Sequence, residues 1–244
     1  MKTTIVKSLK ELCHHKIKWD IRFVEHHLSH AAMAYFTSPF EDAAVLVVDA
    51  VGEDATTTLF KATGCKIECI KQQKFPNSVG LLYSAFTYYL GFQVNSDEYK
   101  VMGLAPYGDL CAEQTQRFIN IIKTKLVSIG DDGSIIINQK YFTFMVGLRM
   151  VDDHVWANLF GIAKRETDAP IKTEHMNLAA AIQYVTEEIF LKLAVHIKAL
   201  TKCNNICISG GCALNCAAMG KIKVSGQFSD VFVPFAPGDD GGAI

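Results

Sequence analysis

The chain has 244 residues, with 24 Lys and Arg against 25 Asp and Glu, and half of its residues are apolar. This balance excludes a disordered acidic or basic tail, which would have few aromatic residues and a large net charge. It also argues against a nucleic-acid partner held by a strong overall positive field. The length is sufficient for one large domain or two small ones.

No run of about 18 consecutive apolar residues occurs, so we expect no transmembrane helix and no membrane partner. The first twenty residues are polar and charged and lack the apolar stretch of a signal peptide. Eight cysteines are too few for a disulfide scaffold. We therefore expect free thiols and a cytoplasmic location, and we interpret the pairs Cys65/Cys69, Cys203/Cys207 and Cys212/Cys216 as small buried residues rather than zinc ligands.

The apolar spacing predicts a mixed order of helices and strands. Helices are predicted over residues 4–15, 26–37, 78–90, 111–127, 141–151, 153–164, 173–200 and 213–223. Strands are predicted over 19–24, 43–51, 56–61, 66–75, 134–138, 205–209 and 231–234, with loops over 92–109 and 237–242. Three successive strands followed by a long helix and a strand–helix–strand unit indicate an α/β fold, with a mixed sheet flanked by helices.

His26 and His30 are the first candidates for chemistry. They lie four residues apart in a predicted helix, so both imidazoles project from one face. Neutral imidazoles at this spacing are good ligands for Zn, Fe, Cu or Ni. Position 27 is His rather than the Glu of a zinc protease. The alternative is two partly exposed helix histidines bonded to backbone or water.

Acidic residues at two other places are further candidates, and one of the pair Asp239 and Asp240 could complete a His/His/Asp metal set. Asp49 interrupts the apolar run LVVDAVG, where a carboxylate is costly unless it is paired, hydrogen-bonded or metal-bound; the alternative is a carboxylate capping a turn. Gly52, just after it, would let a phosphate approach the backbone. Asp239 lies in the segment PGDDGG, which is either a solvated turn or a site for a hard cation or phosphate.

Two further segments could contact a phosphate group. Gly210 and Gly211 form a turn between a predicted strand and a predicted helix, where backbone N–H groups can bind an anion, although an ordinary tight turn has the same pattern. The segment DEYKVMG, with Lys100 and Gly103, follows a predicted helix. Lys100 is a candidate phosphate partner, and the alternative is a charged loop.

Six segments taken together resemble one family more specifically than any one alone. They are EHHLSHAAMAYFTSPF, AAVLVVDAVGEDATT, FPNSVGLLYSAFTYYLGF, DEYKVMGLAPYG, SGGCALNCAAMGKI and PFAPGDDGGAI. In this order they resemble the O-carbamoyltransferases of antibiotic tailoring and nodulation-factor biosynthesis. The resemblance runs from about residue 22 to the end of the chain, and is less distinctive over about 110–170.

The resemblance implies an actin/Hsp70/sugar-kinase type of fold, with two RNase-H-like halves around a nucleotide cleft. Residues 1–40 would end the first half, and residues 41–244 would form the second half with a helical insert at about 110–170. Threonylcarbamoyl transferases acting on tRNA, the Kae1-like proteins, share this fold. Because the family has further segments before and after the matched region, we expect the chain to be a fragment that is not fully active alone.

The resemblance also implies a metal and a nucleotide. Iron, or alternatively zinc or manganese, would be held by His26, His30, Asp49 and Asp239. ATP would contact two groups of residues. These are the turn Gly210, Gly211 and Asn215, and the stretch from Glu98 to Ala105 with Lys100 and Gly103; the glycine at position 52 is a further candidate. His27 is assigned as a general base by its position alone.

The reaction implied has two stages. Carbamoyl phosphate and ATP first give a carbamoyl-adenylate, and a hydroxyl of a small-molecule or sugar acceptor then attacks the carbamoyl carbon and releases AMP. One alternative is a relative that carbamoylates a tRNA-linked group. The other, from a different class, is a non-catalytic fragment that binds nucleotide and metal. The sequence does not identify the acceptor.

Overall fold

The computed structural model describes residues 2–12 and 21–243. Its helices are α1 (Lys2–Leu12), α2 (His26–Phe36), α3 (Val79–Tyr89), α4 (Glu98–Leu104), α5 (Glu113–Ile121), α6 (Asp153–Phe160), α7 (Thr173–Thr201) and α8 (Cys216–Val224). Its strands are β1 (Asp42–Gly52), β2 (Ala55–Thr63), β3 (Lys66–Lys74), β4 (Val127–Ile129), β5 (Ile135–Ile137), β6 (Asn205–Ser209) and β7 (Asp230–Phe232). Short 3-10 turns include η1 (Ala105–Tyr107), η4 (Gly211–Leu214) and η5 (Asp239–Ala243), and a π-helical turn covers Ile122–Leu126.

A five-stranded mixed sheet forms the centre of the fold, in the order β3-β2-β1-β6-β7. Strands β1, β2 and β3 form the expected antiparallel meander, while β6 pairs parallel to β1 and β7 parallel to β6. Strand β1 lies in the middle and is covered on both faces, which explains its nearly continuous apolar run. The predicted α/β class with a mixed sheet is confirmed.

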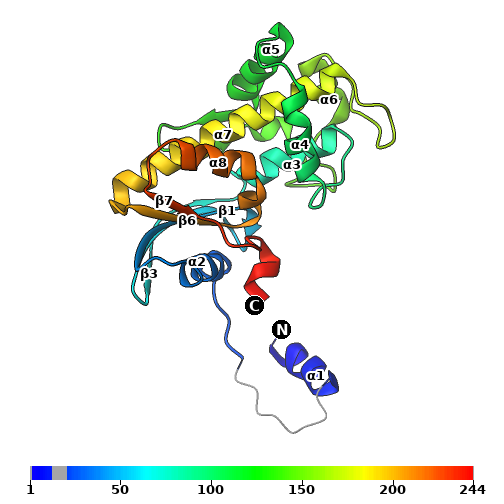
Figure 1. Ribbon diagram of the computed structural model, residues 1–244. Coiled ribbons are helices and arrows are strands. Elements are labelled where there is room, and N and C mark those ends of the chain that lie inside the picture. Colours follow the sequence, from blue (N-terminus) through cyan, green and yellow to red (C-terminus); the bar gives the residue numbers. More distant parts are fainter. Residues whose placement is uncertain (1, 13–20, 244) are drawn as a thin grey trace.

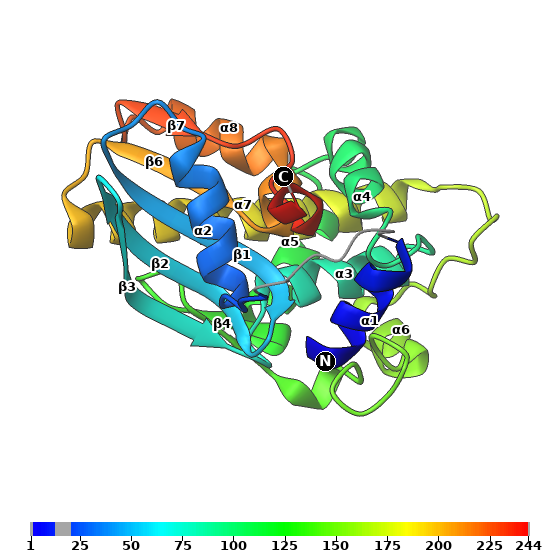
Figure 2. The ribbon, with the colours of Figure 1, turned by 90° about the horizontal axis from the view of Figure 1, so that it is seen from below.

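Helices cover the two faces of the sheet unequally (Figures 1 and 2). Helix α2 alone crosses one face, where Ala31, Ala34 and Tyr35 pack with Val45 and Val47. The opposite face carries α3, α7 and α8. The side chains of β1 alternate between the two cores, so a polar residue near the end of the strand can face α2 while its neighbours stay in the larger core.

The larger core continues from the sheet into the segment between α4 and α7. Trp156 is fully buried and lies within 6 Å of the ring centroids of Phe86, Tyr89, Phe142 and Phe160. Its indole N–H donates to the carbonyl of Tyr141 over 2.8 Å, so the polar edge of the buried ring has a partner.

Several predicted elements are wrong or incomplete. Residues 141–151 are not an α-helix, because Phe142 and Met150 are buried at the two ends of a loop. The expected loop over 92–109 contains α4 and η1, since Val101 and Leu104 are buried there. Residues 21–24 are not a strand, and the rest of the 19–24 prediction lies outside the described residues. Strand β4, the partner of β5, was not predicted.

None of the helices in the described parts of the chain is both long enough and apolar enough to cross a membrane.

Candidate metal centre

The two candidate histidines are in the first turns of α2, which begins at His26. Their rings lie one turn apart with centroids 4.7 Å from each other, as the four-residue spacing predicts. The Ser209 hydroxyl, at the end of β6, donates to the backbone carbonyl of His30 over 2.9 Å. This bond fixes the backbone of α2 against the end of a parallel strand.

Asp49 lies near the end of β1, next to the parallel strand β6. One carboxylate oxygen, Oδ1, accepts a hydrogen bond from the backbone N–H of Ala50 over 2.7 Å, which leaves Oδ2 directed at the histidines. The Ser78 hydroxyl donates to the carbonyl of Ala50 over 2.6 Å and accepts from the N–H of Leu81, so it joins the end of β1 to the start of α3. Ligands of α/β sheets bind at this carboxyl end of parallel strands.

Four side chains from three distant segments converge at this point. The Nε2 atoms of His26 and His30 are 3.1 Å apart; each is 3.2–3.3 Å from Asp49 Oδ2 and 3.1–3.2 Å from Asp239 Oδ1. All four ligand atoms lie within 4.8 Å of one another. The structure therefore brings together the residues that the sequence analysis assigned to a metal.

His30 and Asp49 of the cluster shift each other's pKa values toward the charged forms. Burial alone would raise the pKa of Asp49, but hydrogen bonds from His30 and from the backbone of Ala50 outweigh it and lower the pKa to about 2. Burial alone would lower the pKa of His30, but the carboxylates of Asp49 and Asp239 raise it above its usual value. A cation that binds here competes with the proton for His30, so its affinity falls as the pH decreases.

The donor set fits a metal ion. Two ligands bound at about 2.0–2.2 Å lie roughly 2.8–3.6 Å apart, for cis-octahedral to tetrahedral angles. This range includes the 3.1 Å between the two Nε2 atoms and the 3.1–3.3 Å from each Nε2 to the two carboxylate oxygens. Two imidazole nitrogens and two carboxylate oxygens suit iron, zinc or manganese. The His30 side chain is 3% exposed and that of Asp239 is 76% exposed, so the cluster is closed around His30 and open around Asp239. Water or a substrate oxygen could enter there.

The other ring nitrogen of His30 does not match a usual metal site. Nδ1 is buried and has no hydrogen-bond partner among the described residues, whereas the second nitrogen of a metal-bound histidine usually donates to one.

The Gly210–Gly211 turn directly adjoins the cluster. Gly210 has a φ of 88°, and a Cβ there would lie 2.3 Å from the carbonyl oxygen of Val48. A Cβ on Gly211 would lie 3.1 Å from Asp49 Oδ1. The N–H of Gly210 donates to the carbonyl of Pro237 over 2.8 Å, two residues before Asp239. These glycines thus let the segment carrying Asp239 approach the end of β1.

Gly52 has a different neighbour from the one expected. A Cβ at this position would lie 2.2 Å from His26 Cδ2 and 2.9 Å from His27 Cδ2. The absence of a side chain makes room for the histidine rings, whether or not a phosphate also approaches. The assignment of Gly52 to the nucleotide remains a prediction.

The other residues assigned to the nucleotide lie on α4 and at the start of α8. Lys100 is on α4, and its ammonium group is 2.9 Å from Asp97, one turn earlier. Gly103 lies on the same helix, with open space where a Cβ would be. Asn215 caps α8 by accepting from the N–H of Ala218, and its amide makes two hydrogen bonds of 2.9 and 3.0 Å to Gln183. Contact of these residues with a nucleotide remains a prediction.

His27 is buried, although the sequence analysis assigned it as a base. It is 3% exposed, and its Nδ1 lies 2.7 Å from the hydroxyl of Thr58 on β2. Burial lowers the pKa of His27 to about 4, so the ring is neutral at pH 7. Nε2 is buried and has no hydrogen-bond partner in the described part of the chain.

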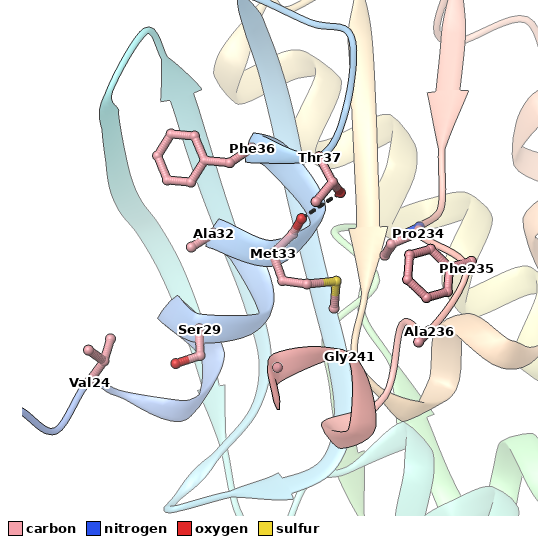
Figure 3. Close-up of a pocket in the computed structure, with 11 residues that line it drawn as sticks. Val24, Ser29, Ala32, Met33, Phe36, Thr37, Pro234, Phe235, Ala236 and Gly241 are labelled. Atoms are coloured by element: carbon pink, nitrogen blue, oxygen red, sulfur yellow. Dashed lines mark hydrogen bonds between the residues drawn. The ribbon is translucent and has the colours of Figure 1, made fainter. Parts of the chain in front are cut away.

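A pocket of about 410 Å³ lies beside the cluster, between α2 and η5 (Figure 3). Its lining is mostly apolar and consists of Val24, Ser29, Ala32, Met33, Phe36, Thr37, Pro234, Phe235, Ala236, Gly241 and Gly242. The Met33 side chain points into the space between the helix and the segment 234–236 (Figure 3). The pocket shares α2 and η5 with the metal centre but does not contain its ligands.

Some residues that shape the site had no signal in the sequence. Three hydroxyl side chains make hydrogen bonds across the fold: Ser78, Thr58 and Ser209. Because serine and threonine also occur at many positions without such a bond, the sequence does not single these three out. Gln183 lies on the buried side of α7, where it accepts a hydrogen bond from Tyr83 and bonds to Asn215. Only the folded arrangement reveals these contacts.

The fold and the cluster define an α/β protein with a His/His/Asp/Asp centre at the end of its parallel strands. Residues 1–244 match the family model described as carbamoyltransferase N-terminus, so the chain belongs to this family and the resemblance is confirmed.

Three similar proteins extend well beyond the chain. An uncharacterised protein from Synechocystis is 44% identical over all of this chain and 39% of its own length. Nodulation protein NolNO from Sinorhizobium fredii is 33% identical over 92% of this chain and 30% of its own length. Nodulation protein NolO from Bradyrhizobium diazoefficiens is 32% identical over 91% and 37%. The chain thus spans between three and four tenths of each relative.

Proposed function

We propose that this chain is the metal- and nucleotide-binding part of an ATP-dependent O-carbamoyltransferase. The proposed enzyme transfers a carbamoyl group from carbamoyl phosphate, through carbamoyl-adenylate, to a hydroxyl of a small-molecule or sugar acceptor. One observation carries the proposal: the convergence of two imidazoles and two carboxylates within 4.8 Å, in a chain of a carbamoyltransferase family. Two relatives are named as nodulation proteins, in agreement with the nodulation-factor carbamoyltransferases that the sequence resembles.

The residues of the cluster have separate tasks in this proposal. His26, His30, Asp49 and Asp239 would hold a divalent ion, which when bound would neutralise phosphate charge and polarise the carbamoyl carbonyl. Asp239 is exposed and borders the side from which a substrate enters. Asp49 is fixed by the backbone of Ala50, so the buried half of the ligand set keeps its orientation without the ion.

The turn at Gly210 and Gly211 would receive the phosphates of ATP. It adjoins Asp49 and has no side chains that could block the approach of an anion. In the first stage one water is consumed, phosphate leaves carbamoyl phosphate and pyrophosphate leaves ATP. In the second stage the acceptor oxygen bonds to the carbamoyl carbon, AMP leaves and the hydroxyl proton is lost.

The actin/Hsp70/sugar-kinase type of fold is part of the same proposal. The mixed five-stranded sheet, with an antiparallel meander on one side and parallel strands on the other, supports an RNase-H-like half. Residues 41–244 would form this half, and residues 1–40 would end its counterpart. Because the relatives are longer, the rest of the active site would come from the parts of the protein that they contain beyond this region.

The metal content of purified variants tests whether the converging imidazoles and carboxylates bind a metal ion. His26→Ala and His30→Ala are expected to remove stoichiometric metal from the protein purified with iron(II), zinc or manganese, as measured by mass spectrometry of the elements. His154→Ala is the control, because His154 is an exposed imidazole on α6. Unchanged metal content in both ligand variants would disprove the proposed centre.

Turnover separates a carbamoyltransferase from a protein that only binds nucleotide and metal. The full-length protein is incubated with ATP and carbamoyl phosphate, and pyrophosphate and AMP are measured. Release of pyrophosphate that requires carbamoyl phosphate and is lost in Asp239→Asn supports the proposal. A thermal shift with ATP but no pyrophosphate release supports the binding alternative.

A further inference from the structure

His27 lies next in sequence to a proposed metal ligand but faces a different part of the fold. Its ring centroid is 5.9 Å from that of His26 and 6.5 Å from that of His30, and its Nδ1 is bonded to Thr58 on β2. Because successive residues of a helix point about 100° apart, His27 is directed at the sheet while the two flanking ligands face the cluster.

The hydroxyl of Thr58 engages one ring nitrogen of His27. It lies 2.7 Å from Nδ1 and also accepts a hydrogen bond from the side-chain amide of Gln72 over 3.3 Å. The second nitrogen, Nε2, is buried and has no hydrogen-bond partner among the described residues. A general base must lie within hydrogen-bond reach of the proton that it abstracts, and the His27 side chain, 3% exposed, is closed off from such a substrate.

The bond to Thr58 helps to anchor the first turn of α2. Residues 26–29 of this turn include a single buried side chain, His27, beside the partly buried Leu28. The N-cap residue Glu25 makes no side-chain capping hydrogen bond. The polar contact to Thr58 therefore adds to the packing of Leu28 in a turn that has less buried apolar surface than the rest of the helix.

The partner of His27 is also close to the other half of the cluster. Thr58 is paired with Val47 in the register of β1 and β2, two residues before Asp49. The bond thus joins the first turn of α2, which carries His26 and leads directly into His30, to the strand pair that carries Asp49.

We propose that His27 is a positioning residue rather than a base: its hydrogen bond to Thr58 holds the first turn of α2 so that His26 and His30 face Asp49 and Asp239. This inference rests on the proposed metal centre. It predicts that Thr58, which is not a ligand, controls metal affinity.

A double-mutant cycle tests the inference with metal affinity as the readout. The dissociation constants of Zn²⁺ and Mn²⁺ are measured by competition with a chelator for the unaltered chain, Thr58→Val, His27→Leu and the double variant. Loss of a residue that orients a ligand typically costs about 10–100-fold in affinity, so each single change is expected to weaken binding in that range. The double variant is expected to be no weaker than either single one, because both remove the same bond.

Two controls separate positioning from a general loss of stability and from base catalysis. Ser29→Ala changes the same turn away from the cluster and is expected to leave metal affinity unchanged. His27→Asn can place an amide near the position of Nδ1 and restore the bond to Thr58, so it is expected to recover affinity to within about threefold of the unaltered chain, although it has no basic nitrogen.

Each outcome supports or overturns the inference. Unaltered affinity in Thr58→Val and His27→Leu, or additive losses in the double variant, would overturn it. If the unaltered chain itself binds neither ion, the metal centre fails first, and this result is distinguishable because it does not depend on any substitution.

Discussion

Gly52 shows how one missing side chain can shape a ligand set. A Cβ there would lie 2.2 Å from His26 Cδ2, which is closer than any real contact, so Gly52→Ala must displace the ring or the end of β1. We expect at least about a tenfold loss of metal affinity, comparable to the loss of an orienting residue. Isothermal titration with Zn²⁺ measures the loss.

The matched control for this change is Gly220→Ala in α8, where a Cβ would meet open space. It is expected to leave metal affinity unchanged and to stabilise the protein by about 0.5–1 kcal/mol, because alanine favours a helix. Equal affinity in Gly52→Ala and Gly220→Ala would show that the histidine ring has another position from which it can bind metal.

The thiols divide according to burial, which corrects the expectation that the cysteine pairs are buried. Cys203 and Cys207 are buried, but Cys65, Cys69 and Cys216 are exposed. Burial raises the pKa of the Cys207 thiol to about 11, so this thiol stays protonated at pH 8.

We expect a disulfide reagent at pH 8 to modify the exposed thiols Cys65, Cys69, Cys111 and Cys216 rapidly, and Cys203 and Cys207 only after unfolding. Mass spectrometry of peptides identifies the sites, and Cys13→Ser removes the one cysteine outside the described residues. Rapid labelling of Cys207 in the folded protein would contradict the buried position of β6.

Residue spacing in the sequence was enough to predict that the imidazoles of His26 and His30 meet, but not the surroundings of His27 between them. The four-residue separation of His26 and His30 fixes their relation within one helix turn. Asp49 stood out because an apolar strand rarely contains an unpaired carboxylate. The environment of His27 depends on β2, more than thirty residues away, and no local pattern encodes that contact.

At the scale of elements, Ser78 links helix α3 to the ligand-bearing end of β1. Its hydroxyl accepts from the N–H of Leu81 as an N-cap and donates to the carbonyl of Ala50. Ser78→Ala is expected to cost about 1–2 kcal/mol of unfolding free energy, from the lost cap and the unsatisfied carbonyl, and also to weaken metal binding.

Asp152→Ala is the comparison, because Asp152 caps α6 by accepting from the N–H groups of His154 and Val155, in an element that carries no ligand. It is expected to cost about 1 kcal/mol with no change in metal affinity. Urea denaturation and metal titration of both variants provide the test. Equal effects on metal affinity would show that the helix cap at Ser78 has no specific link to the centre.

Helices and strands with a clear periodic pattern of apolar residues could be predicted from the sequence. Segments whose conformation depends on tertiary contacts could not. The long helix α7 and the meander β1–β3 follow directly from apolar spacing. Residues 141–151 are rich in apolar residues but form a loop, because the ends at Phe142 and Met150 are buried while Val146 and Leu148 are exposed. The burial of its two ends, rather than the spacing of its apolar residues, determines the loop conformation of residues 141–151.

At the scale of the whole molecule, one core joins the sheet to the segment between α4 and α7. The larger core cluster contains Leu46 and Val48 of β1, Ile182 of α7 and the aromatic side chains around Trp156. The segment between α4 and α7 buries its apolar side chains against the sheet. Neither the segment nor the sheet could keep these side chains buried without the other, so the stability of both depends on the same contacts.

We therefore expect the described body of the chain to unfold in a single cooperative transition. In urea, the far-ultraviolet circular dichroism and the fluorescence of Trp156 should change with the same midpoint, and Trp19→Phe removes the second of the two tryptophans from the signal. Phe160→Ala, which keeps the Trp156 fluorophore, should lower the unfolding free energy by about 3–5 kcal/mol and move both midpoints together, because a large cavity would open in the shared core. A fluorescence midpoint well below that of circular dichroism would instead show that the region around Trp156 unfolds independently, and the metal centre would then survive its loss.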